Sequence, residues 1–138
     1  LLIALVFMLR RKKNKGGDVT VQLDEAMDVW ARDQVAKLVA DKLELEELDV
    51  AETLGGSPDP DLVTRLEKAV SGVELVYERA LDAKDHADVR VEVRLERGDL
   101  LRTIQRMPWA QLPAGVREEF AKTGTAQIYR SWLFPWQR

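Results

Sequence analysis

The sequence predicts an α+β protein in which the end of a transmembrane helix precedes a small, mostly helical domain with a short antiparallel three-stranded sheet. Three patterns predict this fold: an apolar run followed by a basic run, apolar residues spaced by three and four, and strict apolar–charged alternation at 89–96. The 138 residues, 46% of them hydrophobic, suffice for one domain with its own core. With no Cys and one His, disulfide scaffolds, Cys-ligated metals and thiol catalysis are excluded.

The first nine residues are all apolar, and at ~1.5 Å per residue they span about half of a ~30 Å hydrocarbon core. We therefore expect them to be the end of a longer membrane-crossing helix whose earlier residues lie upstream. A basic cluster follows the apolar run, which is typical of a stop-transfer segment and places the remaining chain in the cytoplasm. The cluster would also bind anionic lipid. It comprises Arg10, Arg11, Lys12, Lys13 and Lys15.

This pattern predicts a single-pass protein of the cell membrane with two parts. Residues 1–17 form the anchor and a linker that ends in Gly16 and Gly17, and residues 18–138 form one cytoplasmic domain. The alternative is a buried N-terminal strand or helix followed by a basic linker.

In the first half of the domain, alternation of Val19, Val21 and Leu23 predicts a strand. Apolar spacing then predicts an amphipathic helix over about 25–42, and a further apolar pattern among acids runs to Gly55-Gly56. Asp59 and Pro60 form a strong helix start, and the apolar stripe after them predicts a helix over about 60–84.

In the second half, residues 89–95 alternate between apolar and charged side chains, which predicts a strand with one solvated face. A short helix is expected from about residue 100 to the break before Pro108. Pro113 opens another short helix that Gly124 closes, and residues 125–134 are rich in β-branched and aromatic residues, which predicts a last strand.

The formal charge of −3 is unevenly distributed: residues 1–15 carry +5, residues 16–88 carry −12 and residues 89–138 carry +4. The acidic middle argues against nucleic-acid binding, which needs a concentrated positive field. It favours either a protein partner or complementarity within the chain. The acidic helical residues Glu44, Glu46 and Glu47 form either a solvated face or a docking surface.

A block of aromatic residues lies in the basic C-terminal third. Its members either seal the core as the last strand docks or form an exposed patch, since Trp and Phe are favoured at interfaces. We predict that this block takes part in partner binding. The residues are Trp109, Tyr129, Trp132, Phe134 and Trp136.

No nucleophile, phosphate-binding loop or metal-ligand motif is recognisable, so no cofactor and no catalytic residue is predicted. The chain is therefore interpreted as a membrane-tethered, non-enzymatic adaptor or accessory subunit of a membrane-associated complex. One alternative is a small ligand-binding, metal-binding or enzymatic domain using carboxylates at 82–88, where Asp82 and His86 would share a helical face. Another is a self-assembling scaffold built on the long helix.

Overall fold

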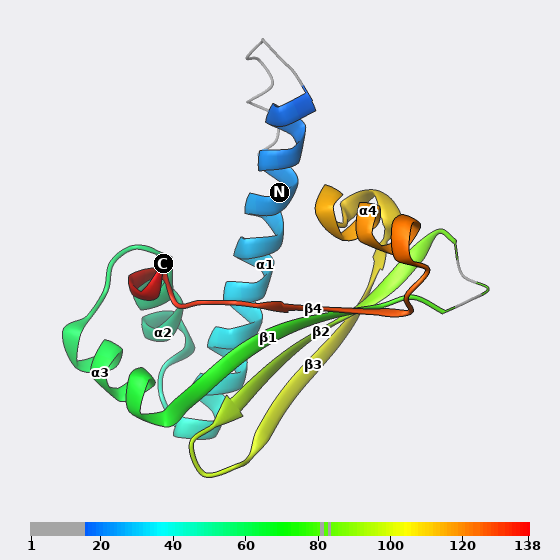
Figure 1. The fold of residues 1–138 in the computed structure, drawn as a ribbon. Coiled ribbons are helices and arrows are strands. Elements are labelled where there is room, and N and C mark those ends of the chain that lie inside the picture. Colours follow the sequence, from blue (N-terminus) through cyan, green and yellow to red (C-terminus); the bar gives the residue numbers. More distant parts are fainter. Residues whose placement is uncertain (1–15, 81, 83) are drawn as a thin grey trace.

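The computed structural model describes residues 16–80, 82 and 84–138 and shows an α+β fold (Figure 1). The helices are α1 (Gly16–Leu43), α2 (Glu47–Gly55), α3 (Pro60–Ala69) and α4 (Ala114–Thr123). The strands are β1 (Val70–Glu78), β2 (His86–Leu95), β3 (Leu100–Pro108) and β4 (Gln127–Ser131), and two short 3₁₀ turns are η3 (Trp109–Gln111) and η4 (Pro135–Gln137).

The four strands form one sheet in the order β3-β2-β1-β4, and every neighbouring pair is antiparallel. Helices α1, α2 and α4 lie on one side of this curved sheet (Figure 1). The core fills the space between them. From α1 it includes Met27, Ala31, Val35 and Val39, which repeat every four residues and therefore share one helical face.

The sheet contributes the alternate residues of β1 and β2 to the same core. Val73 lies opposite Val93, Leu75 opposite Val91, and Tyr77 opposite Val89. Directly opposite residues share a face, so the intervening residues of each strand point away from the helices. This alternation divides the sheet into a helix-covered face and a second face, which we call the open face.

Several predicted elements are confirmed. The helix expected at 25–42 lies within α1, the strand at 89–95 is β2, the helix after Pro113 is α4, and the last strand is β4. The Asp59 side chain accepts the backbone N–H of Asp61 at 3.0 Å, as a helix cap should. Gly124 ends α4 in the left-handed conformation with φ 68°.

Three predicted elements are wrong, and the sheet has four strands rather than three. Residues 19–23 belong to α1, because Val19 and Leu23 also fit a four-residue spacing that continues to Met27. The helix expected over 60–84 ends at Ala69, where β1 begins. The segment expected to form a helix at about 100–104 is instead part of β3, which pairs along its whole length with β2.

Within the described part of the chain, no helix combines the length and the apolar character needed to cross a bilayer. This finding overturns the prediction of a single-pass protein of the cell membrane. The segment on which that prediction was based, residues 1–9 with the basic cluster that follows them, lies outside the described residues.

Candidate functional site

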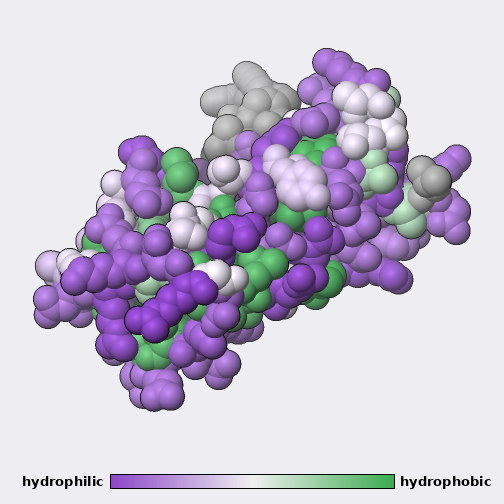
Figure 2. All heavy atoms as spheres, turned by 60° about the horizontal axis from the view of Figure 1, so that its bottom comes forward, coloured by the Kyte–Doolittle hydropathy of each residue, from purple (hydrophilic) through white to green (hydrophobic). Residues whose placement is uncertain are grey.

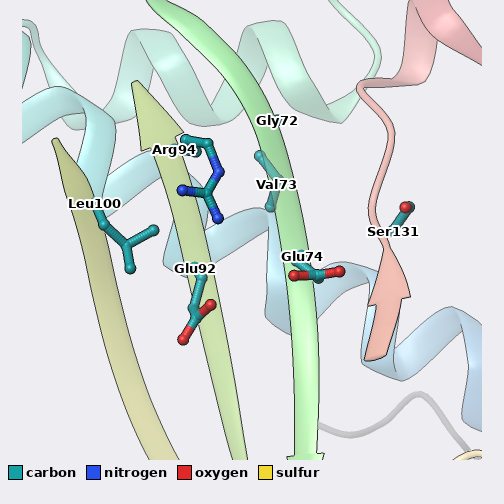
Figure 3. Close-up of a pocket in the computed structure, with 7 residues that line it drawn as sticks. All are labelled: Gly72, Val73, Glu74, Glu92, Arg94, Leu100 and Ser131. Carbon is teal, nitrogen blue, oxygen red and sulfur yellow. The ribbon is translucent and has the colours of Figure 1, made fainter. Parts of the chain in front are cut away.

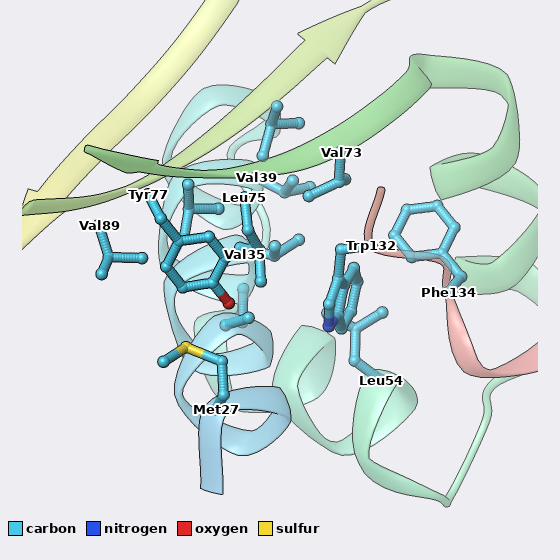
Figure 4. Close-up of a cluster of buried hydrophobic side chains, with 14 of the residues drawn as sticks. Met27, Val35, Val39, Leu54, Val73, Leu75, Tyr77, Val89, Trp132 and Phe134 are labelled. Atoms are coloured by element: carbon cyan, nitrogen blue, oxygen red, sulfur yellow. The ribbon is translucent and has the colours of Figure 1, made fainter. Parts of the chain in front are cut away.

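The C-terminal aromatic residues divide between core and surface. Trp132 and Phe134 are buried, and Figure 4 shows Trp132 beside Leu54 in the core cluster. The Trp132 and Phe134 rings meet edge to face with centroids 6.0 Å apart, and Phe134 stacks on Trp136 at 4.9 Å. Tyr129, by contrast, keeps 52% of its surface exposed. Trp132 and Phe134 therefore close the core, and Tyr129 remains available for contact.

Polar atoms fasten this aromatic segment to two helices. Asp28 of α1 accepts the Trp132 indole N–H at 2.8 Å and pairs with the Arg138 guanidinium at 2.7 Å. Burial alone would raise the pKa of Asp28, but the hydrogen bonds from Arg138 and Trp132 outweigh it, and the pKa is lowered. The Trp136 indole N–H donates to Glu67 of α3 at 3.0 Å. The segment after β4 is thus held by its own polar contacts.

Trp109 belongs to a separate cluster at the far end of the sheet. Its ring packs against Phe120 of α4 with centroids 5.7 Å apart. The Arg79 guanidinium lies over both rings, 5.0 Å from the Phe120 centroid and 5.7 Å from that of Trp109. This cluster therefore ties η3 and α4 to the end of β1.

The predicted acidic docking residues lie where α1 ends and α2 begins. Glu44, Glu46 and Glu47 are all exposed, and none of them makes an ion pair with another described residue. Glu44 has φ 58°, so the chain turns sharply between the two helices. Leu48, which follows Glu47 in the chain, is 67% exposed. We call these four residues the acidic turn.

The helical geometry expected at 82–88 is wrong, because Asp82 follows β1 and His86 is the first residue of β2. Asp82 and His86 therefore do not share a helical face. His86 Nδ1 lies 2.8 Å from Asp85, and this hydrogen bond is the main cause of a lowered pKa at Asp85. Asp88 pairs with Arg106 at 3.6 Å. No group of three or more metal-ligating side chains is found among the described residues.

The open face of the sheet is a surface that sequence reasoning did not assemble. One row of facing residues crosses all four strands, from Ile104 through Arg90 and Val76 to Tyr129. Next to it runs a second row, in which Arg102, Glu92, Glu74 and Ser131 follow one another across the same strands. In the described part of the chain no helix covers these rows (Figure 1).

Arg90 is the structural centre of the open face. Its guanidinium donates to Glu78 at 2.8 Å and to Glu92 at 3.0 Å. Burial would lower the pKa of Arg90, but these two carboxylates outweigh it and raise the pKa. The neighbouring Val76 is fully buried although it faces away from the helices. Paired charges and a covered valine therefore give this face a fixed framework.

A shallow depression of about 270 Å³ lies on the open face, and Glu74, Glu92 and Ser131 of the second row line it (Figure 3). Glu74 and Glu92 reach it from neighbouring strands, and Arg94, Leu100 and Ser131 lie around them. Glu92 is already paired with Arg90. Glu74 and Arg94 make no ion pair or side-chain hydrogen bond with other described residues, so both charges are free to meet a ligand.

Exposed apolar side chains accompany these charges. Ile104 is 54% exposed and Leu100 36%, both on β3, and Tyr129 stands at the opposite side of the sheet. In Figure 2, where the bottom of Figure 1 comes forward, hydrophobic side chains form separate spots among hydrophilic ones. A mixed surface of this kind is typical of non-obligate protein interfaces.

Comparison of the chain with protein-family models, with curated proteins and with solved structures finds no match in any of the three.

Proposed function

We propose that this chain is a non-enzymatic protein-binding domain, an adaptor or accessory subunit, whose open sheet face docks a partner protein. The observation that carries the proposal is the one-sided cover of the sheet: helices pack on one face, and the other presents Ile104 and Tyr129 among charged residues. An apolar contact flanked by free charges such as Glu74 and Arg94 can supply both affinity and orientation.

The paired charges of the open face support the same proposal. Because Arg90 is held by two carboxylates, its neighbours are positioned before a partner arrives, and little side-chain ordering remains to oppose binding. Exposed tyrosine and isoleucine side chains supply the apolar contact area that interfaces bury.

The acidic turn is a second candidate for the docking surface. The specific observation in its favour is the exposed Leu48 beside three acidic residues without ion pairs. One exposed leucine is ordinary on a protein surface, so we rank this surface below the open face.

An affinity capture from extracts of the source organism distinguishes the two surfaces. The bait is the full chain as wild type, as Ile104→Asp with Tyr129→Asp, or as Leu48→Asp. Val29→Asp serves as the matched control, since Val29 is an exposed apolar residue of α1. Circular dichroism verifies that each bait is folded.

We expect a protein captured by wild type and by Val29→Asp to be lost from the open-face double variant. Loss only from Leu48→Asp would move the docking surface to the acidic turn. Equal capture by all four baits, or by none, would contradict the proposed function.

A further inference from the structure

Strand β3 is the outer strand on one side of the sheet. It runs for nine residues, pairs with β2 along its length, and has no other neighbour among the described strands. Each outer strand has backbone N–H and C=O groups directed away from the sheet, and another extended segment can pair with them. The outer strand on the opposite side, β4, offers only five residues.

The open-face side chains of β3 follow a simple pattern. Arg102, Ile104 and Arg106 are spaced by two residues and therefore stand in line on one face. All three are exposed, and the Arg106 side chain keeps 70% of its surface exposed. Arg102 makes no ion pair with a described residue, and β3 has no acidic residue of its own. The strand thus presents two positive charges on either side of one apolar side chain, and the charge of Arg106 is shared with Asp88 of β2 at 3.6 Å.

The helix-covered side of β3 also leaves surface for an added strand. Gln105 is exposed there, and its side-chain oxygen accepts the Trp30 indole N–H at 2.9 Å. Trp30 is only partly buried against the core. A further strand beside β3 would lie next to Gln105, the hydrogen-bond partner of Trp30, and burial of apolar surface there would favour the addition.

A second copy of the chain fits this strand poorly. If two β3 strands paired in antiparallel register about Ile104, each Arg102 would face Arg106 of the other copy, and a parallel pairing would also bring arginines together. Like charges directly opposite each other destabilise strand pairing. The charge pattern therefore disfavours these two registers of a second copy and favours an occupant of opposite charge.

We propose that the partner adds an extended acidic segment to β3, with carboxylates opposite Arg102 and Arg106 and an aliphatic residue opposite Ile104. This inference rests on the proposed function and names the chemistry of the partner. Backbone hydrogen bonds supply affinity in such strand additions, and the alternate side chains supply selectivity.

Fluorescence anisotropy with labelled peptides and the full chain tests the charge pattern. The probe is acetyl-Thr-Val-Glu-Thr-Val-Thr-Glu-Val-Thr-amide, and the control peptide has Lys in place of both Glu. We expect wild type to bind the Glu peptide roughly tenfold more tightly than the Lys peptide. The double variant Arg102→Glu with Arg106→Glu should invert this preference.

Backbone N-methylation tests the strand pairing itself. Two versions of the Glu peptide are N-methylated, one on its odd and one on its even residues. Since only one alternating set directs N–H groups at β3, one version should lose binding and the other should keep it. Equal binding of the two versions would mean contact through side chains alone and would overturn the strand addition.

The remaining outcomes separate this inference from the proposed function. Absence of Glu-peptide binding, or equal affinity for the Glu and Lys peptides, overturns the acidic occupant. Dimers of wild type in sedimentation that Arg102→Glu with Arg106→Glu abolishes would assign β3 to a second copy instead. Capture of a partner that still depends on Tyr129, which lies on β4, would leave the proposed function standing in either case.

Discussion

At the scale of single residues, Asp28 joins two parts of the chain that are more than a hundred positions apart. It accepts the indole N–H of Trp132 and pairs with Arg138, whose guanidinium also lies 5.2 Å from the Trp132 ring centroid. One carboxylate thus positions the aromatic segment against α1. Half-buried networks of this kind contribute more than isolated surface ion pairs.

Replacing this carboxylate should weaken the fold measurably. We expect Asp28→Ala to lower the free energy of unfolding by about 1–2 kcal/mol, because the indole loses its acceptor and Arg138 loses its counter-charge. Asp28→Asn is the matched variant, since it keeps an acceptor and loses only the charge, and it should cost less. Urea denaturation at pH 7 measures both, and an unchanged midpoint for Asp28→Ala would contradict the assigned contacts.

The same residue predicts a pH dependence. The pKa of Asp28 in the folded protein lies below its ordinary value of 3.8, so the unfolded chain takes up this proton more readily than the folded one. The stability that Asp28 contributes is therefore present above pH 3.8 and is lost as the pH falls through the lower folded-state pKa. The free energy of unfolding of Asp28→Asn, measured with urea at several pH values, should fall less steeply over this acidic range than that of the wild type. An identical dependence on pH in the two proteins would refute the prediction.

Tyr77 is the buried titratable residue of the core, where its ring lies near Met27 and Val89 (Figure 4). Burial, assisted by the negative charge of Asp24 and opposed by Arg130, raises the pKa of Tyr77 from 10.0 to about 12. The folded protein therefore retains a proton that the unfolded chain releases, and stability falls as the pH rises above 10.

We expect Tyr77→Phe to remove this alkaline loss of stability. Between pH 9 and 11 the wild type should become progressively less stable relative to the variant, as measured by denaturant unfolding. Absorbance at 295 nm supplies an independent measurement: up to pH 11 both folded proteins should give nearly the same tyrosinate signal. A markedly smaller signal in Tyr77→Phe would show that Tyr77 ionises readily in the fold.

At the scale of elements, the segment after β4 seals the core, and β4 itself presents side chains on the open face. We expect Trp132→Ala to lower the free energy of unfolding by roughly 3–5 kcal/mol, as removal of a buried aromatic ring does. Tyr129→Ala, on β4 just before Trp132 but half exposed, should cost less than about 1 kcal/mol. Urea denaturation compares them, and similar losses for both would contradict their different burial.

The element boundaries show what local sequence reasoning can reach. The local pattern alone predicted α4, from Pro113 and Gly124 at its ends, and β2, from the alternation of apolar and charged residues. The helix predicted over 60–84 continued past the true end of α3 at Ala69, because Val70, Val73 and Tyr77 are also compatible with a helical stripe. The buried Leu75 between them, which a strand places on the core face, was the signal for β1. Strand β3 was not predicted, because Leu100 and Ile104 are exposed and show no alternation toward the core. Its extended conformation follows from pairing with β2, which is not visible in the local sequence.

The candidate site was partly predictable for the same reason. The alternation in β2 predicted a solvated face carrying Arg90 and Glu92. The rows that make this face a surface depend on the register of β1, β3 and β4, which are distant in sequence. The strand predicted at 125–134 is confirmed only for Gln127–Ser131, and its prediction did not reveal that Tyr129 and Ile104 belong to one row.

At the scale of the whole molecule, the uneven charge of the chain is used partly within the fold. Acidic residues of the middle block pair with arginines of the C-terminal third, at Asp28–Arg138, Glu78–Arg90 and Asp88–Arg106. These three pairs account for a small part of the asymmetry, and most acidic residues of the middle block pair with no arginine of the C-terminal third among the described residues. Among the remaining charges and exposed apolar side chains are those of the open face, of β3 and of the acidic turn, where we place the candidate docking surfaces.

Site-specific photo-crosslinking tests the docking surface most directly. A benzophenone amino acid is placed at position 104, 129, 48 or 29 of the full chain, and extracts of the source organism are irradiated. The open-face proposal predicts that positions 104 and 129 yield an adduct with the same protein, while position 29 on α1 yields none. An adduct formed from position 29 or 48 but from neither open-face position would contradict it.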